Sequence, residues 1–284
     1  MRIGALIAPP LLALALAAPA AGAAADARVA ALQVALRAKG VYGGSVDGIQ
    51  GPQTVEAVRE IQERARITVD GVVGPETRKV LGPLGRPGVG SRSLAIGMRG
   101  WDVASLQFRL ALRGFPSGAF DGGFGPHTDA AVRRFQEWAG LVVDGQAGPA
   151  TLRALAAPPP VSPVTFSPPL YVPYGDGFGP RGVSMHTGLD FAAPTGTPVL
   201  AARTGVVTVS RSIDGYGNVV ALMHELGTST LYAHLSAILV RSGQTVAVGQ
   251  PIGRLGATGS ATGPHLHFEV RVRGAAIDPL PAIR

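Results

Sequence analysis

Histidines are concentrated in the last third of this chain, where five of the six lie between His186 and His267. Imidazole binds metals and exchanges protons near neutral pH, so this concentration favours metal binding or acid–base catalysis. Cysteine is absent, so a metal site must use histidine, aspartate or glutamate. His186-x-x-x-Asp190 supplies a nitrogen and an oxygen ligand, and His267 supplies a third. Three such ligands leave a fourth tetrahedral position for water, as in a catalytic zinc site.

A strand pattern surrounds His267. In the segment 263–270, apolar and polar residues alternate, as in a half-buried β-strand. Successive strand side chains point to opposite faces, so His265 and His267 share one face. Both can bind a metal, or one can bind it while the other handles protons. A pair of surface histidines is the alternative interpretation.

A zinc site of this kind also needs catalytic helpers. Zinc lowers the pKa of its water to about 7, and a base or hydrogen-bond donor must then take the proton and stabilise the oxyanion. His234 and His265 are the candidates for these catalytic roles. His224-Glu225 is not part of an H-E-x-x-H motif, because position 228 is threonine.

The elements that carry these residues are predicted to be short strands. Beyond Tyr171 the sequence consists of β-type runs separated by glycine turns, which predicts an all-β domain of antiparallel sheet over 171–284. The predicted strands are 199–202, 205–210, 218–223, 230–234, 251–255 and 265–272.

The first half of the chain is an internal repeat with a constant offset of 74 residues and no gap. Each copy is predicted to form three short helices, which in the first copy begin near Arg28, Pro52 and Pro75. The Asp-Gly pairs are predicted turns in which the aspartate bonds its own backbone. The predicted repeats span 27–83 and 92–156, so the whole chain is a multidomain α+β protein. The recurring blocks are Leu32-Gln33 and Leu106-Gln107, 51–54 and 125–128, and 69–77 and 143–151.

The N-terminal segment predicts where in or outside the cell the protein works. After Met1 and Arg2 the chain is uncharged up to Ala25, with an apolar run and small-residue A-x-A sites, which predicts a signal peptide over 1–25. A membrane anchor is the alternative, which the prolines at 9 and 10 weaken.

Residues 157–170 are predicted to form a proline-rich linker. We expect a secreted protein that works outside the cytoplasm, without stable membrane insertion and as a monomer.

The net charge of +7 comes almost entirely from arginine and suits an anionic partner. The charge is thinly spread, with 16 basic and 12 acidic residues in 26–157 and 8 and 6 in 158–284. Because there is no Lys/Arg block or interleaved aromatic residue, nucleic acid is disfavoured, which leaves a membrane surface or a cell-wall polymer as the anionic partner.

The repeated blocks resemble the three-helix peptidoglycan-binding domain of wall hydrolases. The resemblance rests on the Asp-Gly-x-x-Gly-Pro-x-Thr blocks and the Leu-Gln helix opening, and covers 27–83 and 95–156. It implies a noncovalent anchor on peptidoglycan and assigns no individual binding residues. His127 stands where the first repeat has Gln53, so it is predicted to be a surface residue and not a ligand.

The last domain resembles the M23 (lysostaphin/LytM-type) zinc endopeptidases over about 171–280. The motifs that carry this resemblance are His186-Thr187-Gly188-Leu189-Asp190, Tyr232-Ala233-His234-Leu235-Ser236, Gly263-Pro264-His265-Leu266-His267-Phe268-Glu269, Gly196-Thr197-Pro198-Val199, Gly215-Tyr216-Gly217-Asn218 and Gly249-Gln250-x-Ile252-Gly253.

The resemblance implies a role for each matching position. His186, Asp190 and His267 would bind one Zn²⁺, and His234 and His265 would be catalytic without being ligands. His224 would be structural. The segment 178–181 is closer to members that cut stem-peptide cross-links than to those that cut glycine bridges. Arg181 would bind substrate or brace its loop.

We therefore expect a secreted zinc endopeptidase that hydrolyses peptide bonds in the cross-link region of peptidoglycan, with peptidoglycan as both substrate and anchor. The alternative is a catalytically silent or latent wall-binding regulator of other wall hydrolases. Silent relatives have lost metal ligands, whereas all three are present here. A latent enzyme would have its cleft covered by the N-terminal half.

Overall fold

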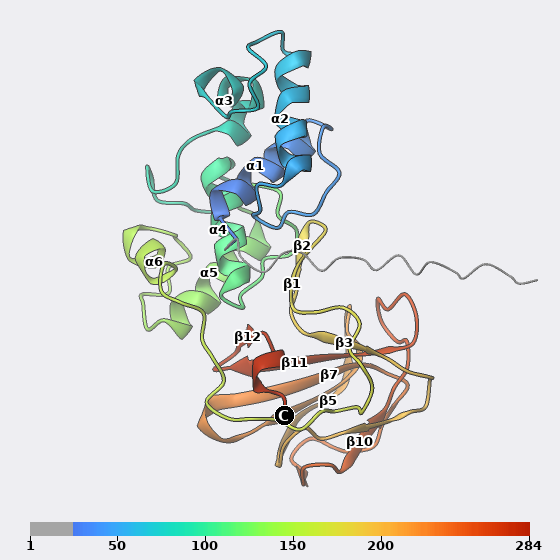
Figure 1. Cartoon of the computed structure of the whole chain (residues 1–284). Helices are drawn as coiled ribbons and strands as arrows, with labels where there is room; N and C mark the ends of the chain where they lie inside the picture. Colours follow the sequence, from blue (N-terminus) through green and yellow to red (C-terminus); the bar gives the residue numbers. More distant parts are fainter. Residues whose placement is uncertain (1–24) are drawn as a thin grey trace, which may run out of the picture.

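The computed structural model describes residues 25–284. The predicted signal peptide lies outside this part of the chain, apart from Ala25. In 25–284 no helix is both long and apolar enough to cross a membrane. A helical half is followed by an antiparallel β domain (Figure 1), which confirms the predicted α+β class.

The helical half consists of two three-helix units. Four of its helices begin at a proline that follows a glycine, because proline presets the helical φ and its missing N–H would be unpaired there anyway. The second and third helices start at Pro52 and Pro75 as predicted, and the first starts one residue before Arg28. The helices are α1 (Ala27–Ala38), α2 (Pro52–Arg64), α3 (Pro75–Leu81), α4 (Trp101–Leu112), α5 (Pro126–Trp138) and α6 (Pro149–Ala154), with a 3₁₀ turn η1 (Gly82–Gly85).

A buried glutamine explains the repeated motif. The carboxamide oxygen of Gln33 accepts the N–H groups of Asp47 and Gly48, and its Nε2 donates to Asp47 Oδ1 and Thr54 Oγ1. Asp47 Oδ1 also accepts the N–H of Ile49, which confirms the predicted aspartate turn. Each motif is therefore a self-satisfied polar unit within a small core. The same arrangement surrounds Gln62, Gln107 and Gln136.

The β domain is built on one main antiparallel sheet with strand order β12-β11-β7-β6-β5-β9, to which β3 adds by pairing with β11. A smaller sheet has the order β4-β10-β8, and β1 and β2 form a hairpin. The strands are β1 (Gly179–Arg181), β2 (Ser184–His186), β3 (Leu189–Ala192), β4 (Pro198–Leu200), β5 (Gly205–Ile213), β6 (Gly217–Met223), β7 (Thr228–Leu235), β8 (Ala237–Ile238), β9 (Thr245–Val246), β10 (Pro251–Arg254), β11 (His265–Val272) and β12 (Ala275–Ile277), with 3₁₀ turns η2 (Glu225–Gly227) and η3 (Leu280–Ala282).

Strand β11 coincides with the predicted strand 265–272. Its buried Leu266, Phe268 and Val270 all belong to the main apolar cluster of the β domain, which places the alternating histidines on the opposite face. The other predicted strands lie within three residues of β4, β5, β6, β7 and β10 at each end.

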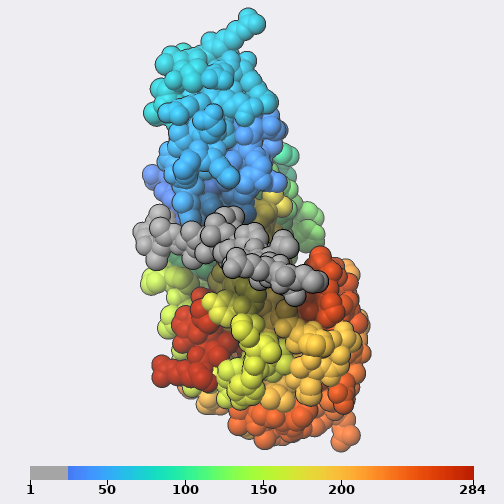
Figure 2. Space-filling model, turned by 45° about the vertical axis from the view of Figure 1, so that its right-hand side comes forward, coloured from blue at the N-terminus to red at the C-terminus, as the bar shows by residue number. Residues whose placement is uncertain are grey.

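The β1–β2 hairpin joins the two halves. At its tip, Gly182 O accepts the N–H of Val46 and Val183 O accepts the N–H of Phe120, each at 2.7 Å. Val46 and Phe120 occupy equivalent positions of the two repeats. Met185 of β2 is buried in the apolar cluster that both repeats share. Figure 2 shows the yellow atoms of this region meeting the blue and green atoms of the repeats.

Candidate metal centre

The candidate ligands come from three strands of one region. Strands β3 and β11 pair so that Asp190 lies directly opposite His267, and His186 is the last residue of β2. The turn between β2 and β3 passes very close to β11, because a Cβ on Gly188 would lie 2.2 Å from Phe268 O. Only glycine permits that approach, so Gly188 allows His186 and Asp190 to face the same point.

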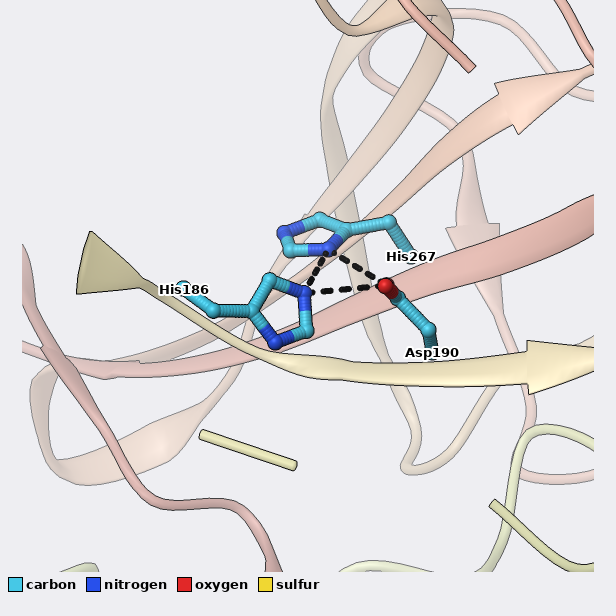
Figure 3. A group of neighbouring side chains, drawn as sticks. All are labelled: His186, Asp190 and His267. Atoms are coloured by element: carbon cyan, nitrogen blue, oxygen red, sulfur yellow. Dashed lines mark hydrogen bonds and ion pairs between the residues drawn. The ribbon is translucent and has the colours of Figure 1, made fainter. Parts of the chain in front are cut away.

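Three ligand atoms converge there (Figure 3). His186 Nε2 lies 3.0 Å from Asp190 Oδ1 and 3.0 Å from His267 Nδ1, and His267 Nδ1 lies 2.9 Å from Asp190 Oδ1. Ligand atoms at about 2.0–2.1 Å from a tetrahedral zinc are roughly 3.3 Å apart. The triangle formed by these three atoms therefore has nearly the dimensions of one face of a zinc tetrahedron.

The remaining ring nitrogens fix which nitrogens point to the centre. His186 Nδ1 lies 2.7 Å from Gly177 O, which can only accept, so Nδ1 carries the proton and Nε2 the lone pair. His267 Nε2 lies 3.1 Å from Glu269 Oε1, which likewise leaves the lone pair on Nδ1. With neutral rings, two nitrogen lone pairs and one carboxylate oxygen meet without a proton between them. Such a donor set fits a cation with tetrahedral N/O preference, and zinc is one.

The electrostatics of the site also call for a positive charge. Burial opposes protonation of His267, but its hydrogen bonds to Asp190 and Glu269 raise its pKa to about 9. Burial would raise the pKa of Asp190, but when the rings of His186 and His267 are protonated their positive charge and hydrogen bonds hold that pKa well below its ordinary value. The site thus stabilises a carboxylate and attracts a cation, whether a proton or a metal.

A buried carboxylate supports His267 from behind. Glu269 is fully buried and accepts hydrogen bonds from Thr187 Oγ1 at 2.5 Å, Tyr216 OH at 2.9 Å and Arg271 Nε at 2.6 Å. Burial and the adjacent Glu269 carboxylate raise the pKa of Tyr216 to about 12, so Tyr216 remains a donor. This network was not predicted from the sequence. The available signal was Glu269 itself, a charged residue inside the motif that contains His267.

The two predicted catalytic histidines lie beside the ligand atoms. His234 Nδ1 donates to Thr258 O at 2.8 Å and His265 Nδ1 donates to Gly263 O at 2.9 Å, so each neutral ring carries its lone pair on Nε2. The centroids of the two rings are 4.7 Å apart, and both residues line the cleft above the centre. Burial, with His265 and His267 nearby, lowers the pKa of His234, which keeps it available as a base.

The cleft has a volume of about 1160 Å³. Arg181 lines it, and its Nη1 donates to Asp190 Oδ2 at 3.3 Å and to Asp176 Oδ2 at 3.0 Å. Arg181 therefore braces the carboxylate of Asp190 so that Oδ1 faces the two histidines. Of the helical half, within residues 25–284, only Gly118 lines this cleft.

The remaining histidines lie elsewhere. The two nitrogens of His224 bond Thr204 O and Thr230 Oγ1, each at 2.9 Å, and its ring packs against Phe166, as expected for a structural residue. His127 is exposed on the second repeat, as predicted.

Two family models match the chain. Residues 184–279 match peptidase family M23, and residues 25–81 and 99–155 match a putative peptidoglycan binding domain. These matches confirm the two resemblances seen in the sequence.

Curated relatives match about a third of the chain. A DD-carboxypeptidase/endopeptidase, Mpg, of Neisseria meningitidis serogroup B is 50% identical over 96 residues, which are 34% of this chain and 22% of that protein. The peptidoglycan DD-endopeptidase ShyA of Vibrio cholerae is 48% identical over 100 residues, 35% of this chain and 23% of that protein. The chain thus spans less than a quarter of the length of these relatives.

Solved structures match a similar part of the chain. A zinc-containing peptidase from Vibrio cholerae is 41% identical, with a TM-score of 0.39, over 41% of this chain and 39% of that one. The catalytic domain of lysostaphin from Staphylococcus simulans is 37% identical, with a TM-score of 0.37, over 39% of this chain and 90% of that one.

Proposed function

We propose that this chain, which combines a domain of peptidase family M23 with two peptidoglycan-binding repeats, is a zinc-dependent endopeptidase that hydrolyses peptide bonds in peptidoglycan cross-links. The observation that carries this proposal is the convergence of three potential ligand atoms, His186 Nε2, Asp190 Oδ1 and His267 Nδ1, within 3.0 Å of one another. One relative is a DD-carboxypeptidase/endopeptidase and another is a peptidoglycan DD-endopeptidase, which supports D,D cross-links as the substrate.

The ligand residues would hold the metal on the floor of the cleft. Bound zinc supplies Lewis acidity and lowers the pKa of a coordinated water. Glu269 keeps His267 in the tautomer that points Nδ1 at the centre, and Arg181 holds the second oxygen of Asp190. These contacts fix the donor atoms before a metal arrives.

His234 and His265 would handle protons and charge. Each ring is oriented by a backbone carbonyl on Nδ1, so each presents Nε2 to the cleft. In its neutral form such a ring accepts the proton of the attacking water, and in its protonated form it donates to the tetrahedral oxyanion or to the leaving amine.

The helical repeats would hold the enzyme on its polymer. Two linked binding modules raise the local concentration of scissile bonds and make weak contacts add up. Such an enzyme works outside the cytoplasm, in the cell wall or periplasm, which fits the signal peptide predicted over 1–25. A silent regulator is disfavoured because all three donor atoms are present and aligned. Latency is disfavoured because, within residues 25–284, the repeats border the cleft through Gly118 alone and do not fill it.

The test is digestion of purified sacculi by the chain. We expect cross-linked muropeptide dimers to fall and free amino groups to appear, a chelator to stop both changes, and added zinc to restore them. Mass spectrometry of the released muropeptides identifies the two residues that flanked the broken bond. Cleavage that persists in chelator, or no cleavage with one zinc bound per chain, would contradict the proposal.

A further inference from the structure

A second groove lies beside the metal cleft, on the second repeat. Its volume is about 400 Å³, and it lies between the turn that precedes α5 and the loop 117–119. Gly118 lines both this groove and the metal cleft. The two hollows therefore adjoin at a residue that has no side chain to separate them.

The corresponding place on the first repeat is filled. A Cβ on Gly44 would lie 2.7 Å from Tyr42 OH and 2.8 Å from Gln53 Oε1, so these two side chains cover that glycine. In the second repeat Gly118 stands at the place of Gly44, and a Cβ there would meet nothing within 4 Å. Pro116 and His127 replace Tyr42 and Gln53. Of the two repeats, only the second, which adjoins the metal centre, leaves this glycine uncovered and the groove beside it open.

The wall of the groove contains one buried hydroxyl without a hydrogen-bond partner in the described part of the chain. Ser117 lines it and is 5% exposed, and among the described residues its hydroxyl has no hydrogen-bond partner. Native structures leave few buried polar groups unpaired, so such a hydroxyl points to a ligand or to water. Asp121, the carboxylate in the wall, is engaged by Gln107 and by the N–H of Gly123.

A positive charge lies at the same groove. Arg99 lines it and is exposed, and no hydrogen bond of its guanidinium is found within residues 25–284. His127 lies in the first turn of α5, where backbone N–H groups and the helix dipole favour an anion. The groove is therefore suited to a peptide that carries a carboxylate.

We propose that this groove is a substrate subsite of the peptidase: the peptide strand of peptidoglycan runs from the metal cleft across Gly118 and places a carboxylate on Arg99. The inference rests on the proposed function, because it takes the substrate to be a peptidoglycan peptide. On this account the second repeat contributes to the substrate site itself, whereas the first repeat serves only as support and anchor.

Two variants of the full chain test the subsite. Arg99→Glu reverses the charge, and Arg153→Glu, an exposed arginine on α6 of the same repeat, is its matched control. The double variant Pro116→Tyr/His127→Gln gives the second repeat the side chains that cover the glycine in the first. Because the first repeat folds with these residues at the same positions, the double variant should fold, which its circular dichroism and thermal unfolding verify.

The measurement is steady-state hydrolysis of cross-linked disaccharide-tetrapeptide dimers released from sacculi. Loss of a charge-assisted hydrogen bond should raise KM about tenfold in Arg99→Glu, with the effect on KM rather than on kcat. The double variant should raise KM similarly, and Arg153→Glu should match the unaltered chain. Equal KM values in all four proteins would overturn the subsite and leave the proposed function intact.

If the unaltered chain cleaves no dimers, the proposed function fails. A binding measurement then tests whether the groove still binds a peptidoglycan peptide. The zinc-free chain is then titrated with the uncross-linked disaccharide-tetrapeptide by NMR. Shifts of the Gly97, Gly118 and Gly125 amides that disappear in the double variant support the subsite. Absence of those shifts, or their persistence in the double variant, overturns it.

Discussion

His267 presents Nδ1 to the centre because Glu269 holds its other nitrogen. Glu269 is fully buried, and its carboxylate is held by hydrogen bonds from Tyr216 and Arg271. Burial would raise the pKa of Glu269, but Arg271 and His267 hold that pKa well below its ordinary value. The carboxylate therefore stays ionised and makes the imidazole a better donor to a metal.

Replacement of Glu269 by glutamine should weaken zinc binding. The amide keeps the shape but removes the charge that supports His267, and loss of such a partner typically costs about 10–100-fold in metal affinity. Competition with a fluorescent chelator measures the zinc Kd. Glu225→Gln is the control, because Glu225 is an exposed acid that pairs with Arg203 and does not line the cleft. Equal Kd values for the two variants would show that Glu269 has no such role.

The sequence could predict the ligand candidates because they sit in compact motifs. His186 and Asp190 are four residues apart, and His265 and His267 lie on one strand face. It could not predict the Glu269–Tyr216 contact, which joins residues 53 apart through pairing of strands that the chain order does not specify. Bracing of Asp190 by Arg181 likewise depends on where the β1–β2 hairpin folds.

At the scale of elements, the prediction worked where periodicity was strong. Strand β11 has clear alternation, and the helices of the repeats begin at Gly-Pro steps with a fixed φ. The short strands β1, β2, β3, β8, β9 and β12 were not predicted, because two to four residues show no clear period. Strands β4 and β10 are as short, but they lie in the β-type runs 199–202 and 251–255. Their pairing is set by tertiary contacts, such as those of the repeats with the hairpin tip.

The aspartate turns make the helical half sensitive to acid. Hydrogen bonds from Val72 N–H and Gln62 lower the pKa of Asp70 below its ordinary value of 3.8, and those from Gln146 N–H and Gln136 do the same for Asp144. The folded form thus favours the ionised carboxylates. Their contribution to stability is fully present when the pH is above the ordinary pKa of 3.8. It is lost as the pH falls through the lower pKa that these carboxyl groups have in the folded protein.

Thermal unfolding from about pH 5 to about pH 3 measures this effect. The midpoint should fall with pH, and the fall should be smaller in Asp70→Asn/Asp144→Asn, because asparagine keeps the acceptor oxygen without titrating. Glu56→Gln/Glu76→Gln, two exposed acids on α2 and α3, is the matched control. A double Asn variant with the same slope as the unaltered chain would contradict this explanation.

At the scale of the whole molecule, side-chain and backbone contacts join the second repeat to the β domain. Trp138 Nε1 donates to Val272 O at 3.2 Å, Arg273 donates to Trp138 O at 3.1 Å, and the Arg273 guanidinium lies 4.9 Å from the Trp138 ring centroid. With the hairpin contacts at Val46 and Phe120, these fix the second repeat beside the cleft. That placement is what allows a repeat to contribute to substrate binding.

Trp138→Ala should uncouple the two halves. Loss of the ring and its N–H removes about 1–2 kcal/mol from the interface, so calorimetry should show a broadened or split unfolding transition. Trp138→Phe keeps a ring over Arg273, so the width of its unfolding transition should lie between those of the unaltered chain and Trp138→Ala. A single transition of unchanged width in Trp138→Ala would show that this contact does not couple the halves.

The central claim is that His186, Asp190 and His267 hold a catalytic zinc while His265 acts beside it. The most direct test is zinc content by elemental analysis, measured with dimer hydrolysis on the same samples of the unaltered chain, His267→Ala and His265→Ala. We predict one zinc per unaltered chain, loss of zinc and turnover in His267→Ala, and retained zinc with lost turnover in His265→Ala. Equal loss of zinc in both variants, or full turnover without zinc, would contradict the account.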